Sequence, residues 1–337
     1  MIKDNKEHIG VVLLNLGGPD SLDAVRPFLY NLFSDRDIIR LGPAFLQKPI
    51  AWLISTFRSQ KTRDMYSQIG NKSPILDITT AQAQALEQAL NESTGSAPHF
   101  MSYLGMRYWK PFMADTVSTM IQDGISQVIV LSLYPHYSKA TTGSSVTDFN
   151  KAIEGKNIEA SYINEWYNFP SYIDSLAELI SEGIDEYKGD DFEILFSAHS
   201  LPQSFIDEGD PYLDQIKETI KSVTARLGDA PYNLKHLKHH LSFQSKTGPV
   251  KWLEPSTEET ILMLGSKGIR NLFVVPISFV SDHIETLYEI DILYKDFARE
   301  QGVSLKRCRS LNTSATFIHA LRDLVLSTLE KRNGKGQ

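Results

Sequence analysis

Three carboxylates and a histidine lie close together in the last third of the sequence. They are Asp282, Glu285 and Glu289, with His283 directly after the first. In a helix, spacings of three and seven residues place these three carboxylates on one side. A row of acids beside a histidine can bind a divalent metal ion or move protons. The spacing therefore predicts a chemically active surface on this segment.

An apolar, β-branched run at 271–279 must position this acidic row. Such a run is typical of a strand that is buried on both faces of a parallel sheet. In open α/β sheets, ligands bind beyond the carboxyl ends of the strands. Because the acidic helix begins at that end of the run, we expect it to border a ligand site.

A second histidine, His199, follows another apolar run at 192–198 and is flanked by small hydroxyl residues. The chain has no G-x-S-x-G nucleophile signature, so a serine hydrolase is not indicated. His199 is predicted to be a base or a metal ligand, with a hydrogen-bonded structural histidine as the alternative. Since both runs end at one edge of a parallel sheet, His199 and the acidic row should face the same crevice. One histidine with one to three carboxylates suits a divalent metal that is bound loosely and passed on.

Three other polar segments carry weaker signals. The loop at 134–145 follows an apolar run and is rich in hydroxyl groups, which fits either a binding loop or a set of helix caps. The glycines at 17–18 follow a strand but lack the spacing of a nucleotide-binding loop. His236, His239 and His240 are interpreted first as a basic surface segment, and a metal-binding patch is the alternative.

The composition excludes several classes of protein. The 337 residues are 42% hydrophobic and 22% charged, as in a soluble globular protein, and the net charge of −7 does not favour nucleic acid as a partner. The single cysteine, Cys308, excludes an intrachain disulfide and any cluster held by several cysteines of this chain. We expect a cytoplasmic protein, because the N-terminus is too polar for a secretory signal and no apolar run approaches the roughly 20 residues of a spanning helix.

Eight strand-like runs alternate with stretches of helix length. This alternation is typical of βαβ units with parallel sheets. The first four runs are 9–16, 99–105, 127–135 and 158–164, and the second four are 192–198, 240–244, 271–279 and 304–309.

The two sets of runs resemble each other. In both halves a tryptophan precedes a proline near a helix start, and a glycine lies thirteen residues after that proline: Pro111 and Gly124, then Pro255 and Gly268. We therefore predict an α/β protein of two similar doubly wound domains, each with a four-stranded parallel sheet flanked by helices. The expected limits are 9–166 and 167–313, and an amphipathic helix at 314–331 should join the first domain.

A segment at 45–57 is apolar and aromatic with few charges. It is either a buried helix or an exposed lip for an apolar ligand or a membrane surface. The cations that follow it, Arg58, Lys61 and Arg63, form a solvated helix face or pair with carboxylates of a ligand.

Five stretches together resemble ferrochelatase, the enzyme that inserts ferrous iron into a porphyrin in haem biosynthesis. They occur in the family's order over nearly the whole chain. The stretches are Leu14-Asn15-Leu16-Gly17-Gly18-Pro19, the loop from Tyr134-Pro135 to Ser144-Ser145, Ser197-Ala198-His199-Ser200-Leu201-Pro202, Phe243-Gln244-Ser245-Lys246, and the run from Ser281-Asp282 to Glu289.

The resemblance implies roles for individual residues. His199 and Glu285 would face each other across the porphyrin and form the metal and proton-transfer site, and which is the base and which the metal donor stays open. Asp282, His283 and Glu289 would support them on an irregular, π-type helix. The implied porphyrin-binding residues are Leu16, Arg58, Lys61, Tyr66, Arg107 and Tyr134.

The resemblance also implies the substrates. The first hypothesis is a lyase that inserts Fe²⁺ into protoporphyrin IX to give protohaem, and the alternatives are the same reaction on coproporphyrin III, a cobalt chelatase, or a non-catalytic tetrapyrrole or metal carrier. The region from Phe28 to Phe57 resembles a lip that could touch the inner membrane surface. No iron–sulfur cluster is expected. Some members bind such a cluster with four cysteines, one of them near the position that Lys139 occupies here, and this chain has only one cysteine. Some members carry a further acid beyond Glu289, at the position that Leu293 occupies in this chain. We also expect a monomer.

Overall fold

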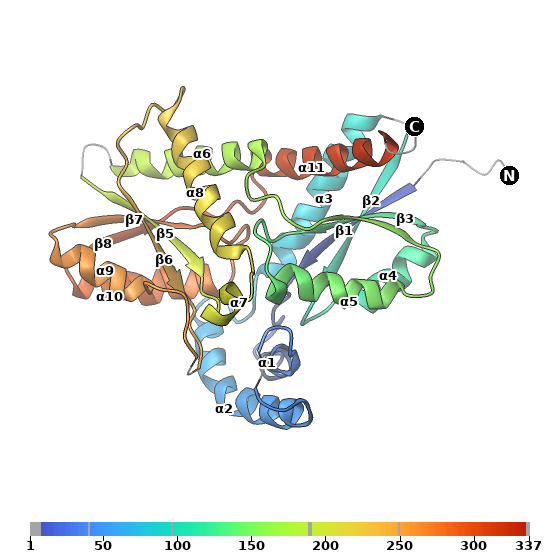
Figure 1. Cartoon of the computed structure of the whole chain (residues 1–337), viewed down its shortest axis with the longest axis horizontal. Helices are drawn as coiled ribbons and strands as arrows, with labels where there is room; N and C mark the ends of the chain where they lie inside the picture. Colours follow the sequence, from blue (N-terminus) through green and yellow to red (C-terminus); the bar gives the residue numbers. More distant parts are fainter. Residues whose placement is uncertain (1–7, 40, 96, 188–190, 249, 335–337) are drawn as a thin grey trace. The chain divides into compact units, whose positions relative to one another are not determined.

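The computed structural model describes residues 8–39, 41–95, 97–187, 191–248 and 250–334. The chain divides into two compact units: one runs up to Glu165 and resumes at Asn312, and the other is Trp166–Leu311. Each unit has its own four-stranded parallel sheet with helices on both faces (Figure 1). The predicted fold class is therefore confirmed, and each of the eight strand-like runs overlaps one strand.

In the first unit the strands lie in the order β2-β1-β3-β4. Helices α4 and α5 pack on one face of this sheet, over alternate apolar residues of β1 and β3 such as Val12 and Val130. Helices α3 and α11 lie on the other face (Figure 1), so β1 is buried on both faces and reads as a continuous apolar run. The strands are β1 His8–Asn15, β2 His99–Met106, β3 Gln127–Ser132 and β4 Glu159–Ile163, and the helices are α1 Val25–Ser34, η1 Ala44–Leu46, α2 Gln47–Ser67, α3 Ile75–Thr94, α4 Met113–Gln122, η2 Lys139–Gly143, α5 Ser144–Ile153 and α11 Ala315–Gly334.

In the second unit the order is β6-β5-β7-β8. One face of this sheet packs on α9, η4 and α10 through residues such as Leu195, Ile261 and Ile290, and α6 and α8 lie on the other face (Figure 1). The strands are β5 Glu193–His199, β6 His239–Gln244, β7 Asn271–Pro276 and β8 Ser304–Arg307, and the helices are α6 Pro170–Ile184, η3 Asp185–Tyr187, α7 Gln203–Asp207, α8 Tyr212–Gly228, α9 Thr257–Ser266, η4 Glu285–Tyr294 and α10 Lys295–Glu300.

The internal similarity seen in the sequence corresponds to repeated backbone structure. Helices α4 and α9 are each 10 residues long and follow a proline whose carbonyl accepts a hydrogen bond from the preceding strand, at 2.9 Å in both units. Each helix is followed by a glycine with positive φ, 77° at Gly124 and 89° at Gly268, a conformation that glycine adopts without steric cost. The two units are therefore copies of one supersecondary plan.

His136 is enclosed in the first unit, in the loop that follows β3, and only 2% of its surface is exposed. Burial disfavours the imidazolium and lowers the pKa of His136 to about 3. Between that pKa and the ordinary value, the unfolded chain binds a proton that the folded chain does not, so stability must fall as the pH falls below about 6.5.

We expect the wild type to lose about 1.4 kcal/mol more unfolding free energy than His136→Gln when the pH is lowered from 7.5 to 5.5. Urea denaturation of both proteins at the two pH values measures this difference. His236→Gln, which replaces an exposed histidine, should lose as much as the wild type. If the free energy of unfolding depends on pH identically in the wild type and His136→Gln, the lowered pKa of His136 is contradicted.

Candidate active site

His199 lies where the sequence analysis placed it, as the last residue of β5. It is in register with Gln244, the last residue of β6, and β7 ends beside it at Pro276. The carboxyl ends of these three neighbouring strands therefore form one edge, and the segments that leave them carry the other candidate residues.

His199 and Glu285 are in direct contact. The Nδ1 atom of His199 lies 2.7 Å from Oε2 of Glu285. The backbone N–H of His199 donates to Oγ of Ser278 at 2.9 Å, and its carbonyl accepts from the Tyr212 hydroxyl at 2.9 Å. The predicted pairing of the strand-end histidine with the acidic row thus corresponds to a hydrogen-bonded pair whose histidine backbone is fixed on both sides.

The contact continues to a second carboxylate through Ser245. The hydroxyl of Ser245 lies 2.8 Å from Oε2 of Glu285 and 2.5 Å from Oε2 of Glu289. The side-chain amide of Gln244 donates to the Glu285 carbonyl at 2.9 Å and to Glu289 at 3.1 Å. His199, Glu285, Ser245 and Glu289 therefore form a short chain of polar contacts along the strand edge.

Glu285 and Glu289 differ in their pKa values, because their charged surroundings differ. Burial alone would lower the pKa of His199, but the charge of Glu285 and the hydrogen bond to it raise that pKa above its ordinary value. Burial would raise the pKa of Glu285, but the charge of His199 holds it well below the usual range. Burial and the neighbouring charge of Glu285 raise the pKa of Glu289 to about 7. The site thus combines an imidazolium–carboxylate pair with a carboxyl group that exchanges a proton near neutral pH.

The helix that carries both glutamates is a π-helix, Glu285–Tyr294, as the family resemblance implied. Such helices are rare and occur frequently at functional sites. His283 lies in the turn before it, with Nδ1 donating to the Ser281 carbonyl at 2.9 Å and Nε2 4.0 Å from Oε1 of Glu285. Burial lowers the pKa of His283, so this ring is neutral beside the site.

Asp282 differs from the two glutamates. Its Oδ1 accepts hydrogen bonds from Arg307 at 3.0 Å, from Ser310 at 2.8 Å and from Thr286 at 3.0 Å. The prediction that all three carboxylates share one side of a helix is wrong for Asp282, because the helix begins at Glu285. Asp282 precedes the helix, and its carboxylate holds neighbouring segments together.

Three predicted porphyrin residues follow neighbouring strands of the first unit: Leu16 after β1, Arg107 after β2 and Tyr134 after β3. The backbone N–H of Arg107 donates to the Asn15 carbonyl at 2.9 Å, which fixes the first two relative to each other. The guanidinium of Arg107 contacts Asp35 at 2.7 Å and donates to Ser144 at 2.8 Å. The structure thus brings these residues to one strand edge of their own unit.

The other predicted porphyrin residues lie on α2. Lys61 is exposed, and the Arg58 guanidinium lies 5.5 Å from the centre of the Phe33 ring. Tyr66 is only 3% exposed and belongs to the core of the unit, so we do not retain it among the ligand contacts. Residues at the start of α2 and in η1 are exposed although they are apolar: Phe45, Leu46, Trp52, Leu53 and Phe57, with Phe57 at 81%. Among the described residues, no helix is long and apolar enough to cross a membrane.

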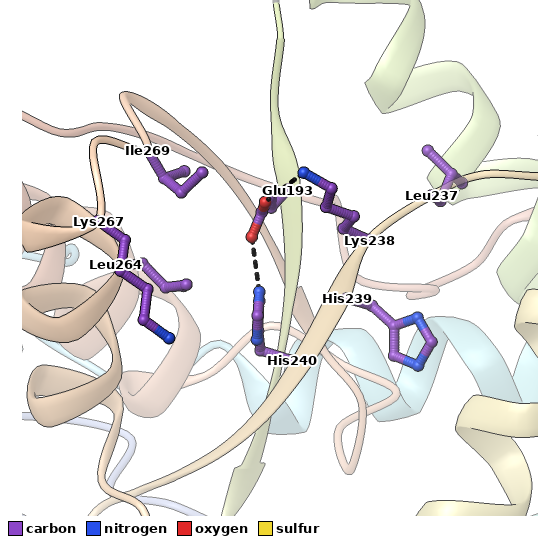
Figure 2. A pocket seen from close by; sticks show the side chains of 8 residues that line it. All are labelled: Glu193, Leu237, Lys238, His239, His240, Leu264, Lys267 and Ile269. Carbon is purple, nitrogen blue, oxygen red and sulfur yellow. Dashed lines mark hydrogen bonds and ion pairs between the residues drawn. The ribbon is translucent and has the colours of Figure 1, made fainter.

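The group of histidines at 236–240 lies away from this site, at the amino-terminal end of the second sheet. His240 Nε2 contacts Glu193 at 2.6 Å, and Lys238 contacts the same carboxylate at 3.4 Å. Figure 2 shows Glu193 between the side chains of Lys238 and His240, and all three residues line one pocket. The hydrogen bonds account for the segment as a charged surface. In the described part of the chain, no three His, Cys, Asp or Glu side chains are grouped so as to hold a metal ion.

Comparison with solved structures concerns the fold. The chelatase SirB of Bacillus subtilis, solved with Fe³⁺, matches with a TM-score of 0.54 over 97% of this chain and 98% of SirB, at 10% sequence identity. The sirohydrochlorin chelatase SirB of the subspecies spizizenii, in complex with cobalt, matches with a TM-score of 0.52 over 97% of both chains, at 12% identity. The fold is therefore that of the chelatases.

Comparison of sequences identifies the family. The pattern that defines ferrochelatases matches residues 8–329. The ferrochelatase of Geotalea uraniireducens (strain Rf4) is 52% identical over 327 residues, 96% of this chain and 98% of the relative, and that of Geobacter metallireducens (strain ATCC 53774 / DSM 7210 / GS-15) is 51% identical over 323 residues, 95% and 98%. The chain belongs to the ferrochelatase family, whose members insert ferrous iron into a porphyrin in haem biosynthesis.

Sequence reasoning assigned no role to four residues that shape these sites: Asp35, Gln244, Ser245 and Arg307. Gln244 and Ser245 stand at a strand end beside His199, which is the same signal that selected the histidine. Asp35 and Arg307 act through partners distant in sequence, and no local pattern marks them.

Proposed function

We propose that the protein inserts Fe²⁺ into protoporphyrin IX to give protohaem, with His199 and Glu285 as the metal and proton-transfer site. The 2.7 Å contact between His199 Nδ1 and Glu285 Oε2 supports this most directly. A histidine and a carboxylate are ligands that ferrous iron accepts, and both groups also bind protons. An iron atom bound by both atoms would take the place of the proton that they share.

Metal insertion also requires that two pyrrole N–H protons leave the porphyrin as the iron loses its bound water. Once iron has displaced the shared proton and left for the porphyrin, His199 can take up one proton, because the Glu285 charge stabilises the imidazolium. Glu289, with its pKa raised to about 7, is a second acceptor and is linked to Glu285 by the Ser245 hydroxyl. The site therefore has groups that can take up both protons, and it supports a reaction rather than storage of a metal ion.

For the porphyrin, we propose Leu16, Arg107 and Tyr134 as pocket residues and Arg58 and Lys61 as partners of its carboxylates. The exposed apolar side chains of η1 and α2 would form a lip for the macrocycle and a peripheral contact with the inner membrane surface. An apolar lip favours protoporphyrin over coproporphyrin III, whose additional carboxylates prefer a more cationic surface. We further propose a cytoplasmic monomer without an iron–sulfur cluster.

An anaerobic assay with Fe²⁺ and each porphyrin, followed by the shift of the porphyrin absorption bands, tests this function. We expect turnover with a higher kcat/KM for protoporphyrin IX than for coproporphyrin III. The reverse preference would establish the coproporphyrin alternative, and binding without turnover would establish a carrier.

The lip is tested in the same experiment with the double variant Trp52→Ser/Phe57→Ser. We expect its protoporphyrin preference and its sedimentation with phosphatidylglycerol vesicles to fall by about tenfold or more, because burial of each exposed aromatic side chain contributes roughly 2 kcal/mol. The control is Leu262→Ser, which removes a side chain of similar exposure, 51%, from the other unit. Equal behaviour of the two variants would refute the lip.

A further inference from the structure

The π-helix Glu285–Tyr294 holds both proposed reactive carboxylates, and its C-terminal end continues into α10. The residue before it, Ile284, makes no side-chain capping hydrogen bond. Wide helical turns are less favourable than α-helical turns and persist where the surroundings hold them. Contacts from other segments, such as those of Gln244 and Ser245 with Glu285, add to the local bonds of the helix in keeping Glu285 against His199.

Arg307, the last residue of β8, contacts the helix and the turn before it at the same time. Its Nε and Nη2 atoms donate to the two carboxylate oxygens of Asp291, both at 2.8 Å. Its Nη1 atom donates to Oδ1 of Asp282 at 3.0 Å. The Arg307 side chain is only 10% exposed, with Asp282 at 19% and Asp291 at 36%, so these are charge-assisted hydrogen bonds from a buried guanidinium.

The two carboxylates bracket the reactive residues along the chain. Asp282 precedes Glu285 by three residues, and Asp291 follows Glu289 by two. Asp282 also accepts from the Thr286 hydroxyl at 3.0 Å, and Thr286 is adjacent to Glu285. One guanidinium thus joins both ends of the segment that carries the glutamates.

We propose that Arg307 is a positioning residue for metal insertion, which holds the segment 282–291 so that Glu285 meets His199. This inference rests on the proposed function for the role of that pair. Arg307 need not touch iron or porphyrin. Lysine cannot replace it, because an ammonium group lacks the planar fork that binds Asp291 with two bonds and reaches Asp282 with a third.

The test compares Arg307→Lys and Arg307→Met with the control Arg299→Met. Arg299 is a 77% exposed arginine of the same unit that pairs with Asp296 at 2.9 Å. Both Arg307 variants should lower kcat for iron insertion by about 10–100-fold and weaken binding of Co²⁺ alone by about the same factor, as loss of residues that orient metal ligands does. KM for the porphyrin should change less than about twofold, since the proposed porphyrin contacts lie in the other unit. Arg299→Met should match the wild type.

A variant of Asp291, which accepts two of the Arg307 hydrogen bonds, keeps the test decisive if the Arg307 variants misfold. Asp291→Asn keeps the shape of the partner and should show the same fall in kcat and Co²⁺ affinity, and the double variant Asp291→Asn/Arg307→Met should be no worse than either. Values of kcat and Co²⁺ affinity within about threefold of wild type in Arg307→Lys and Asp291→Asn would overturn the proposal. A wild type that binds Co²⁺ but turns over no porphyrin would refute the proposed function instead, and the Co²⁺ affinities would still decide the role of Arg307.

Discussion

Replacement of either member of the central pair should abolish iron insertion and leave the protein folded. His199→Ala removes a ring nitrogen that can bind iron or accept a proton, and Glu285→Gln keeps the shape of the side chain but removes its charge. We expect kcat to fall by about 10³-fold or more, because removal of a general acid–base group alone costs roughly 10²–10⁴-fold. Anaerobic turnover measured by porphyrin absorption, together with circular dichroism of each variant, tests the prediction.

Matched controls separate the chemistry from general effects of charge. His236→Ala and Glu300→Gln replace exposed residues of the same two types in the same unit, and both should keep wild-type turnover. Near wild-type turnover of purified, folded His199→Ala and Glu285→Gln would rule out this pair as the reactive centre.

The second large effect is on stability and concerns Asp35. The Asp35 side chain is 8% exposed. Its carboxylate accepts hydrogen bonds from Arg107 at 2.7 Å, Tyr108 at 2.6 Å and Ser144 at 2.8 Å. Burial alone would raise the pKa of Asp35, but the Tyr108 hydroxyl, the Asp37 backbone N–H and the Arg107 charge hold it below the usual value. Asp35 therefore joins the chain after α1 to the end of β2 and the start of α5.

We expect Asp35→Ala to lower the free energy of unfolding by about 3–5 kcal/mol, since it leaves the Arg107 charge with only Asp148 at 3.5 Å. Asp35→Asn should cost less, because it still accepts hydrogen bonds. Urea denaturation measures both, with Asp37→Ala as the control, which changes an exposed neighbour and should cost less than about 0.5 kcal/mol. Similar losses for Asp35→Ala and Asp37→Ala would contradict this account.

The acidic segment beside His199 shows where helical spacing misled the sequence analysis, because Asp282 precedes the helix that carries Glu285 and Glu289. Sequence spacing measures only distance along one helix, and it assigned Asp282, Glu285 and Glu289 to one side. In the structure, Asp282 accepts a hydrogen bond from Arg307, which lies 25 residues further along the chain. Asp282 is thus paired with a cation on β8, and no local sequence pattern marks such a partner.

The amino-acid sequence by itself determined the two α/β units and the strand edge of the candidate site. Apolar, β-branched runs such as 271–276 are typical of buried strands, and the residue after such a run then lies at the carboxyl end of a strand. That rule was enough to bring His199 and the acidic helix together, because β5 and β7 are neighbours. The tertiary structure alone decided the contact between Arg107 and Asp35, 72 residues apart, and the shift of the Glu289 pKa. These depend on burial and on charges brought close by folding, and local sequence patterns record neither.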